Sequence, residues 1–255
     1  MERLIGIVGG VGPYAGWDLA RKVSEQTLAS ADQDHLPVAV LSLPRRIADR
    51  TEYLLGQTPD NPAGAITEVI LRLEGLGATV VGIPCNTAHS PRIFDEIHSR
   101  LRAAGSAVKV PHMIAEVAGF VRENLPNVRR LGVLSTTGTL RAEVYPQVLA
   151  AHGLEVIAPN EQVQAELVHP AIYDRHFGIK ARCNPVTETA RERLIRAIEH
   201  LRARGAEAVV LGCTELPLAI TENRLGPTTL IDPNLVLARA LIREFDATKL
   251  KPLAL

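Results

Sequence analysis

Short apolar runs alternate with stretches of helical periodicity along the whole chain. The apolar runs are rich in β-branched residues and predict strands over residues 4–8, 38–43, 79–83, 131–134, 155–158, 208–211 and 228–231. Between them, the spacing predicts helices over residues 14–30, 64–76 and from about Pro91, one with Ala190, Leu194, Ile198 and Leu201 on one face, and one beginning at Asp232-Pro233. Gly77 and Gly205 stand where a glycine ends a helix. This alternation is typical of parallel sheets covered by helices, so we expect an α/β fold.

Two blocks of sequence recur in the same order, which indicates a duplicated half-chain. In the first block Cys85 and Cys213 are equivalent, and they are 128 residues apart. In the second block the equivalent glycines are 126 residues apart. The paired segments are residues 77–87 with 205–214, and residues 4–12 with 130–138.

Cys85 and Cys213 each end a predicted strand and precede a threonine. Ligands of open parallel sheets bind at the carboxyl ends of the strands. If two similar halves face each other, the two thiols flank one cleft from opposite sides. Stereochemical inversion needs such a pair, because one group removes the α-proton and the other delivers a proton to the opposite face. An isolated cysteine is more often a small buried apolar residue, but that interpretation leaves the repeated position unexplained.

The chemistry of a thiol sets a condition on this hypothesis. A free thiol has a pKa of ~8.5, so a thiolate at pH 7 costs roughly 2 kcal/mol. We expect backbone N–H groups at the start of a following helix to offset that cost.

Composition excludes several classes of protein. The chain has 255 residues, 46% hydrophobic and 22% charged, as expected for a globular protein of one or two domains. Lys plus Arg and Asp plus Glu both total 28, so net charge favours neither nucleic acid nor membrane as a partner. The N-terminal apolar run is too short for a signal peptide, and no segment approaches a membrane span, so we expect a cytoplasmic protein. Three widely spaced cysteines indicate free thiols.

The chain resembles the aspartate/glutamate racemase family, and most of all its aspartate racemase branch. Cys-Asn-Thr-Ala-His at 85–89 together with Gly-Cys-Thr-Glu at 212–215 is the specific part of the resemblance. Further matching segments are residues 9–13, 32–35, 49–51, 135–139 and 231–233. The resemblance implies two pseudo-symmetric α/β domains, each a parallel sheet flanked by helices, with the active site between them. It places the first domain at residues 1–115 plus 225–255 and the second at 116–224.

The resemblance also implies an activity: interconversion of L- and D-aspartate without pyridoxal phosphate, any other cofactor or a metal, with glutamate as a further candidate substrate. Homodimers are usual in this family. Cys85 and Cys213 would be the catalytic acid/base pair. Arg50 would meet the side-chain carboxylate of the substrate, and Lys180 would help to bind a substrate carboxylate. The other implied substrate contacts are Asn86, Thr87, Ala88, Thr136 and Thr139.

Some interpretations stay open. Arg50 can instead form a surface ion pair with Asp49 or Glu52. The glutamate racemase branch has Asp-Ser after the first strand and His after the second Cys-Thr, whereas this chain has Gly9-Gly10 and Glu215. Assistance to the thiols by a carboxylate or imidazole is therefore not assured, and we expect Glu215 to cap the helix that follows.

Rival signals are weaker. Residues 10–15 fit a dinucleotide-binding fingerprint, but the second strand lacks the acidic residue at its end. Cys85 with His89 suggests a nucleophile pair or metal ligands, without a second Cys/His cluster to complete a metal site. His112, His169 and Cys183 have no predicted partner. A one-cysteine isomerase or decarboxylase on the same scaffold, or a non-catalytic protein that binds small acids, remains an alternative.

Overall fold

The chain divides into two compact units in the computed structural model, which describes residues 2–253. The first unit contains the described residues up to Glu116 and from Asn234 onward, and the second is Val117–Pro233. The chain returns to the first unit after Pro233, nine residues later than the sequence-based boundary after residue 224. The difference arises because residues 224–231 form two strands that belong to the sheet of the second unit.

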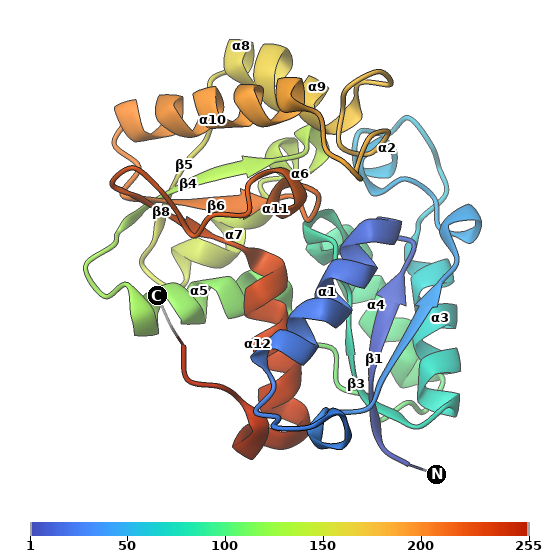
Figure 1. The fold of residues 1–255 in the computed structure, drawn as a ribbon. Helices are drawn as coiled ribbons and strands as arrows, with labels where there is room; N and C mark the ends of the chain where they lie inside the picture. Colours follow the sequence, from blue (N-terminus) through green and yellow to red (C-terminus); the bar gives the residue numbers. More distant parts are fainter. Residues whose placement is uncertain (1, 254–255) are drawn as a thin grey trace. The chain divides into compact units, whose positions relative to one another are not determined.

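The first unit contains a parallel sheet of three strands in the order β2-β1-β3 (Figure 1). Helices α1 and α12 lie against one face of this sheet, and α3 and α4 cover the other. Its elements are β1 (Leu4–Gly9), α1 (Pro13–Gln26), η1 (Asp32–Asp34), β2 (Val38–Ser42), η2 (Pro44–Arg46), α2 (Arg50–Leu54), α3 (Ala63–Gly75), β3 (Ala78–Gly82), η3 (Asn86–His89), α4 (Pro91–Ala103), the start of α5 (Met113–Asn124), α12 (Pro233–Asp246) and η5 (Ala247–Lys249).

The second unit contains a sheet of five strands in the order β5-β4-β6-β8-β7, parallel except for β7. Helix α10 and the stretch from α8 to α9 cover one face, and Tyr145 of α7 packs against the other. Its elements are β4 (Arg130–Ser135), α6 (Thr137–Arg141), α7 (Val144–Ala150), β5 (Glu155–Ile157), α8 (Glu161–Val163), the π-helix η4 (Gln164–Val168), α9 (His169–Tyr173), α10 (Glu188–Ala203), β6 (Ala208–Gly212), α11 (Leu216–Ala219), β7 (Arg224–Leu225) and β8 (Thr228–Ile231). The expected α/β class, with parallel sheets flanked by helices, is confirmed.

The sequence repeat corresponds to the same close packing in both units. A Cβ atom on Gly6 of β1 would lie 2.8 Å from Val81 Cγ2, and one on Gly132 of β4 would lie 2.9 Å from Val209 Cγ2. The other neighbours are also equivalent: Ala78 and Leu73 around Gly6, and Ala206 and Leu201 around Gly132. Both glycines therefore let their strand closely approach the neighbouring strand, β3 or β6, and the helix that precedes it, α3 or α10. The strand order β2-β1-β3 is likewise repeated as β5-β4-β6.

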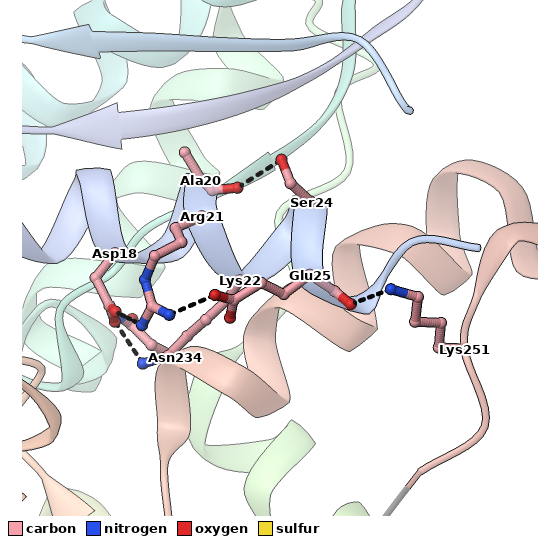
Figure 2. Close-up of polar contacts among 8 residues, drawn as sticks. All are labelled: Asp18, Ala20, Arg21, Lys22, Ser24, Glu25, Asn234 and Lys251. Carbon is pink, nitrogen blue, oxygen red and sulfur yellow. Dashed lines mark hydrogen bonds and ion pairs between the residues drawn. The ribbon is translucent and has the colours of Figure 1, made fainter. Parts of the chain in front are cut away.

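The C-terminal helix is tied to α1 by buried polar contacts, which Figure 2 shows. Asp18 Oδ2 accepts hydrogen bonds from Lys22 Nζ at 2.5 Å and from Asn234 Nδ2 at 2.9 Å. Asn234 also donates to the carbonyl oxygen of Ala15 at 3.2 Å. Further along, Lys251 Nζ donates to the carbonyl oxygen of Glu25 at 2.8 Å. These contacts join segments more than 200 residues apart in the sequence, since 216 residues separate Asp18 from Asn234.

Most element boundaries agree with the sequence pattern to within one or two residues, but the helix predicted over residues 14–30 ends at Gln26. Thr27 adopts extended angles, φ −85° and ψ 132°, and forms a β-bridge with Leu250. Gly77 and Gly205 end α3 and α10 in left-handed conformations, with φ 106° and 94°, as predicted. Within residues 2–253, we find no helix with the length and apolar character needed to cross a membrane.

Candidate active site

The carboxyl edge of the first sheet brings three loops together. Gly10, in the loop after β1, has a φ of 85°, and a Cβ on it would lie 2.7 Å from the backbone nitrogen of Pro44. This position therefore requires glycine, both for its left-handed angles and for the close approach of the loop after β2. The third loop follows β3 and carries Cys85.

Arg50 joins two of these loops. Arg50 is the first residue of α2 and is only 7% exposed. It is therefore not a surface residue, and the alternative of a surface ion pair with Asp49 or Glu52 is wrong. Arg50 Nη2 donates to the carbonyl oxygen of Val11 at 2.6 Å, and Nη1 donates to that of Ala48 at 3.2 Å. The carboxylate of Asp49 instead caps α2, accepting from the backbone nitrogen of Thr51 at 2.7 Å. The guanidinium thus lies at the edge of the sheet, against the glycine-rich loop.

Cys85 opens a fully buried loop after β3. Its side chain is 7% exposed, and Asn86, Thr87 and Ala88 of the following turn are all buried. The turn is a single 3₁₀ turn, η3, and the longer helix α4 begins only at Pro91. The helix expected directly after this cysteine is therefore too short for a substantial dipole. The structure does bring the predicted residues of this loop to the same sheet edge as Arg50.

His89 holds the backbone of Cys85 rather than its thiol. Its Nδ1 donates to the carbonyl oxygen of Cys85 at 2.9 Å. The ring lies against Phe94 and His112, with centroids 4.8 and 5.0 Å away. Burial, with a smaller contribution from His112, lowers the pKa of His89 from 6.5 to about 3, so the imidazole is neutral at physiological pH. The alternative of a cysteine–histidine nucleophile pair is not supported by this geometry.

The carboxyl edge of the second sheet carries the two predicted threonines. Thr136 caps α6, accepting from the backbone nitrogen of Thr139 at 3.2 Å, and the two hydroxyl oxygens are 3.0 Å apart. Gln164, on the π-helix after β5, donates to the carbonyl oxygen of Ser135 at 3.1 Å. His169 Nδ1 lies 3.2 Å from Thr137 Oγ1 in the same region. Neither Gln164 nor His169 carried a signal in the sequence that pointed to this edge.

Cys213 follows β6 at the same edge, and its thiol donates to Glu215 Oε2 at 3.0 Å. The other carboxylate oxygen, Oε1, accepts from Lys180 Nζ at 3.0 Å. The expectation that Glu215 caps the next helix is wrong, because its side chain makes no capping hydrogen bond to α11. Glu215 instead connects the cysteine to a lysine 35 residues away in the sequence.

This environment disfavours the thiolate of Cys213. Burial raises the pKa of its thiol well above the usual value, and the charge of Glu215 raises it further. Lys180 and the backbone N–H of Glu215 act in the opposite direction and lower the pKa. The balance keeps the proton on sulfur in the free protein, with an acceptor carboxylate already in contact.

A tight loop positions Lys180. The backbone nitrogen of Lys180 donates to the carbonyl oxygen of Ile172 at 3.1 Å, and Ile179 donates to Ala171 at 2.9 Å. Gly178 allows this turn, because a Cβ there would lie 2.5 Å from the backbone nitrogen of Asp174. The loop therefore delivers Lys180 to the edge that carries Cys213.

The two units thus present a similar set of groups, each at the carboxyl edge of its own sheet. Each set has a buried cysteine after the strand that pairs with the first strand of its unit, β3 beside β1 and β6 beside β4, and hydroxyl or amide side chains lie at the same edge. A thiol can donate or accept one proton, so each edge carries one acid/base group. Among residues 2–253, no group of three or more His, Cys, Asp or Glu side chains has a metal-binding arrangement.

Known proteins are similar to this chain along almost its whole length. A family model described as Asp/Glu/hydantoin racemase matches residues 8–241. The broad specificity amino-acid racemase RacX of Bacillus subtilis is 26% identical over 251 residues, which are 96% of this chain and 99% of that protein. The aspartate racemase of Picrophilus torridus superposes with a TM-score of 0.79 at 28% identity, covering 98% of this chain and 96% of that one. An aspartate racemase homologue from Pyrococcus horikoshii, 24% identical, shares the fold with a TM-score of 0.70 over 95% of this chain and 99% of its own. The resemblance to the aspartate/glutamate racemase family is thereby confirmed, and the chain belongs to the Asp/Glu/hydantoin racemase family.

Proposed function

We propose that this protein interconverts L- and D-aspartate by a two-base mechanism in which Cys85 and Cys213 act on opposite faces of the α-carbon. One thiolate removes the α-proton, and the other thiol protonates the resulting carbanion from the other side. The proposal requires the two sheet edges to face one substrate. It needs no cofactor, because the thiols carry out both proton transfers.

The observation that carries the proposal is the equivalence of the two cysteines. Each is buried and follows the strand that pairs in parallel with the first strand of its unit, β3 beside β1 and β6 beside β4. Polar side chains accompany both: Asn86 and Thr87 follow Cys85, and Thr136 and Thr139 follow β4, the strand that pairs with β6. A pair of thiols retained for packing alone would not need these surroundings.

The preference for an acidic substrate rests on Arg50 and Lys180, one cation at each edge. A guanidinium can bind a carboxylate through two parallel hydrogen bonds, a geometry that lysine does not reproduce. The name of the Picrophilus torridus protein supports aspartate, and that of RacX supports testing a wider range. A panel of L-amino acids incubated with the protein and analysed by chiral chromatography identifies the substrate. Arg50→Lys should slow aspartate more than alanine or serine, whereas equal losses would contradict a side-chain contact.

Single substitutions test the two-base mechanism. Cys85→Ser and Cys213→Ser should each lower turnover by at least ~10²–10⁴-fold, the contribution of one acid/base group. Cys183→Ser is the matched control, because that cysteine is half-buried and lies in the loop between α9 and α10 rather than at the end of a strand. Near-normal racemisation by either active-site variant would favour a one-cysteine isomerase or decarboxylase. Binding of aspartate without exchange of its α-proton would favour a non-catalytic binding protein.

Isotope labelling in D₂O distinguishes a one-base mechanism of racemisation from a two-base mechanism. Each thiol holds one exchangeable proton, so early D-product should carry deuterium while the remaining L-substrate stays largely unlabelled. The reverse reaction should show the mirror pattern in NMR spectra of the α-position. Substantial early label in recovered L-substrate would contradict two opposed monoprotic bases, even if both cysteines prove essential. The homodimer implied by the resemblance is checked separately by light scattering.

A further inference from the structure

The carboxylate of Glu215 uses one oxygen for a thiol and the other for an ammonium group. Cys213 Sγ donates to Oε2 and Lys180 Nζ donates to Oε1, both at 3.0 Å. Thr214 Oγ1 lies 3.4 Å from the same Oε2. Glu215 is 6% exposed and Cys213 is 5% exposed, so the contact between them is nearly shielded from water. The carboxylate of Glu215 is therefore the proton acceptor in direct contact with this thiol.

The charges around Cys213 leave one proton to be shared between sulfur and oxygen. Lys180 neutralises the carboxylate, and Tyr145 and Asp232 are the further titratable groups that interact electrostatically around the cysteine. With the proton on sulfur, the cluster is a thiol next to a carboxylate–ammonium pair. With the proton on oxygen, it is a thiolate, a neutral carboxylic acid and the same ammonium group. Both states have the same net charge, so moving the proton does not change the net charge of this buried region.

We propose that Glu215 holds the proton of Cys213 whenever this cysteine acts as the base, and that Lys180 keeps the carboxylate in place for it. The proposal rests on the racemase function proposed above and extends it to a residue that acts through Cys213. In that direction the S–H bond breaks, its proton forms an O–H bond on Glu215, and the thiolate takes the α-proton of the substrate. The electron pair of the broken C–H bond remains on the α-carbon, which the other cysteine then protonates.

The cycle closes by exchange with solvent. After the transfer, Glu215 carries one extra proton and Cys85 one fewer, so the carboxylic acid releases a proton to water and Cys85 takes one up. In the opposite direction the same steps run in reverse: the Cys85 thiolate removes the α-proton, Cys213 donates its proton to the α-carbon, and the carboxylic acid of Glu215 returns its proton to the Cys213 thiolate. Glu215 is a positioning residue in this scheme, because it touches the reacting thiol and not the substrate.

Titration of Cys213 tests the proposal without any racemisation assay. In a Cys85→Ser/Cys183→Ser background, Cys213 is the remaining cysteine of the chain, and the pH dependence of its alkylation by iodoacetamide reports its pKa. Glu215→Gln removes a negative charge and should lower this pKa by about one unit, a tenfold change in thiolate fraction. Lys180→Met removes a positive charge and should raise it. Glu222→Gln, which breaks the exposed ion pair with Arg191, is the matched control and should leave it unchanged.

The opposite signs of the two shifts distinguish electrostatic coupling to the thiol from a role in folding alone. If the carboxylate and the ammonium group are not coupled to the thiol, both variants shift its pKa in the same direction or leave it unchanged, and either result overturns the proposal. If Glu215→Gln does not fold, Lys180→Met decides alone: a raised pKa of Cys213 supports the proposal, and an unchanged or lowered pKa overturns it. Circular dichroism of each variant establishes which of these cases applies.

Kinetics of the otherwise unchanged protein provide the second measurement. Glu215→Gln should lower kcat/KM by about a hundredfold, the lower end of the effect of a proton-transferring group. The loss should be equal in both directions, because the equilibrium constant of a racemisation is one. Racemisation without the predicted titration shifts would overturn the role of Glu215 alone. The predicted shifts in a protein that racemises nothing would support the thiol–carboxylate coupling and contradict the proposed function.

Discussion

His89 donates a hydrogen bond from Nδ1 to the carbonyl oxygen of Cys85, four residues earlier, at 2.9 Å. The bond closes the buried turn η3 on the residue that carries the thiol. Its donor is a neutral imidazole, because burial depresses the pKa of His89 to about 3. The turn therefore stays closed across the whole physiological pH range, and the position of Cys85 depends on a side chain that takes no proton itself.

Two substitutions of His89 should distinguish the contribution of this hydrogen bond from the contribution of ring packing. His89→Phe keeps an aromatic ring but leaves the Cys85 carbonyl without this donor, which we expect to cost about 1–3 kcal/mol of stability. His89→Asn keeps a donor at the position of Nδ1 and should retain more of the thiol's reactivity, although it loses contacts with Phe94 and His112. Urea unfolding and the alkylation rate of Cys85 measure the two effects. Equal alkylation rates in both variants would show that the hydrogen bond does not position the cysteine.

The depressed pKa of His89 also predicts loss of stability in mild acid. The unfolded chain takes up a proton near pH 6.5, whereas the folded chain does so only near pH 3. This contribution is complete above pH 6.5 and is lost progressively as the pH falls toward 3. Burial lowers the pKa of His98 and of His112 in the same direction. The melting temperature should therefore fall between pH 7 and pH 4, and less steeply in His89→Asn. The exposed His176→Asn is the control; an identical slope in both variants would contradict the assignment.

Removing one partner of the buried ion pair between Asp18 and Lys22 should strongly lower the free energy of unfolding. Asp18→Asn leaves the Lys22 ammonium buried without its carboxylate partner and weakens the contact with Asn234, so we expect a loss of about 3–5 kcal/mol. Glu25→Gln, which removes an exposed ion pair with Arg21 on the same helix, should change stability by less than about 1 kcal/mol. Urea unfolding compares them. The double variant Asp18→Leu/Lys22→Met should recover most of the loss, and failure to recover would point to Asn234 rather than the ion pair.

Substitutions at Gly10 and Gly56 can distinguish two costs of adding a side chain: strain from left-handed backbone angles, and a clash with a neighbouring loop. Both have positive φ, 85° and 74°, but a Cβ on Gly10 would lie 2.7 Å from the backbone nitrogen of Pro44. Within residues 2–253, a Cβ on Gly56 would have no non-neighbouring heavy atom within 4 Å. Gly56→Ala should cost about 1–2 kcal/mol from the left-handed angles alone. Gly10→Ala should cost more, and should also weaken substrate binding by displacing the loop that Arg50 contacts. Similar melting temperatures for the two variants would show that the loop after β2 adapts easily.

The sequence by itself determined the parts of this protein that depend on local pattern. The period of apolar positions located most strands and helices, and Gly77 and Gly205 marked helix ends because left-handed angles favour glycine. The repeat placed Cys85 and Cys213 at equivalent strand ends, because a duplicated segment folds into the same element twice. The end of α1 was misplaced by four residues because Thr27 pairs with the distant Leu250, which no local pattern encodes.

Only the tertiary structure decided which side chains meet. Glu215 reads locally as a helix cap, yet its carboxylate binds Cys213 and Lys180, because the loop after α9 returns to the carboxyl end of β6. The sequence left a surface ion pair open for Arg50, yet the side chain is buried and contacts Val11, 39 residues away, because β1 and β2 are neighbours in the sheet. The chain pairs β8 with β6 and so extends the second unit to Pro233. These contacts follow from strand order and loop closure, which depend on the free energy of the whole fold rather than on any one segment.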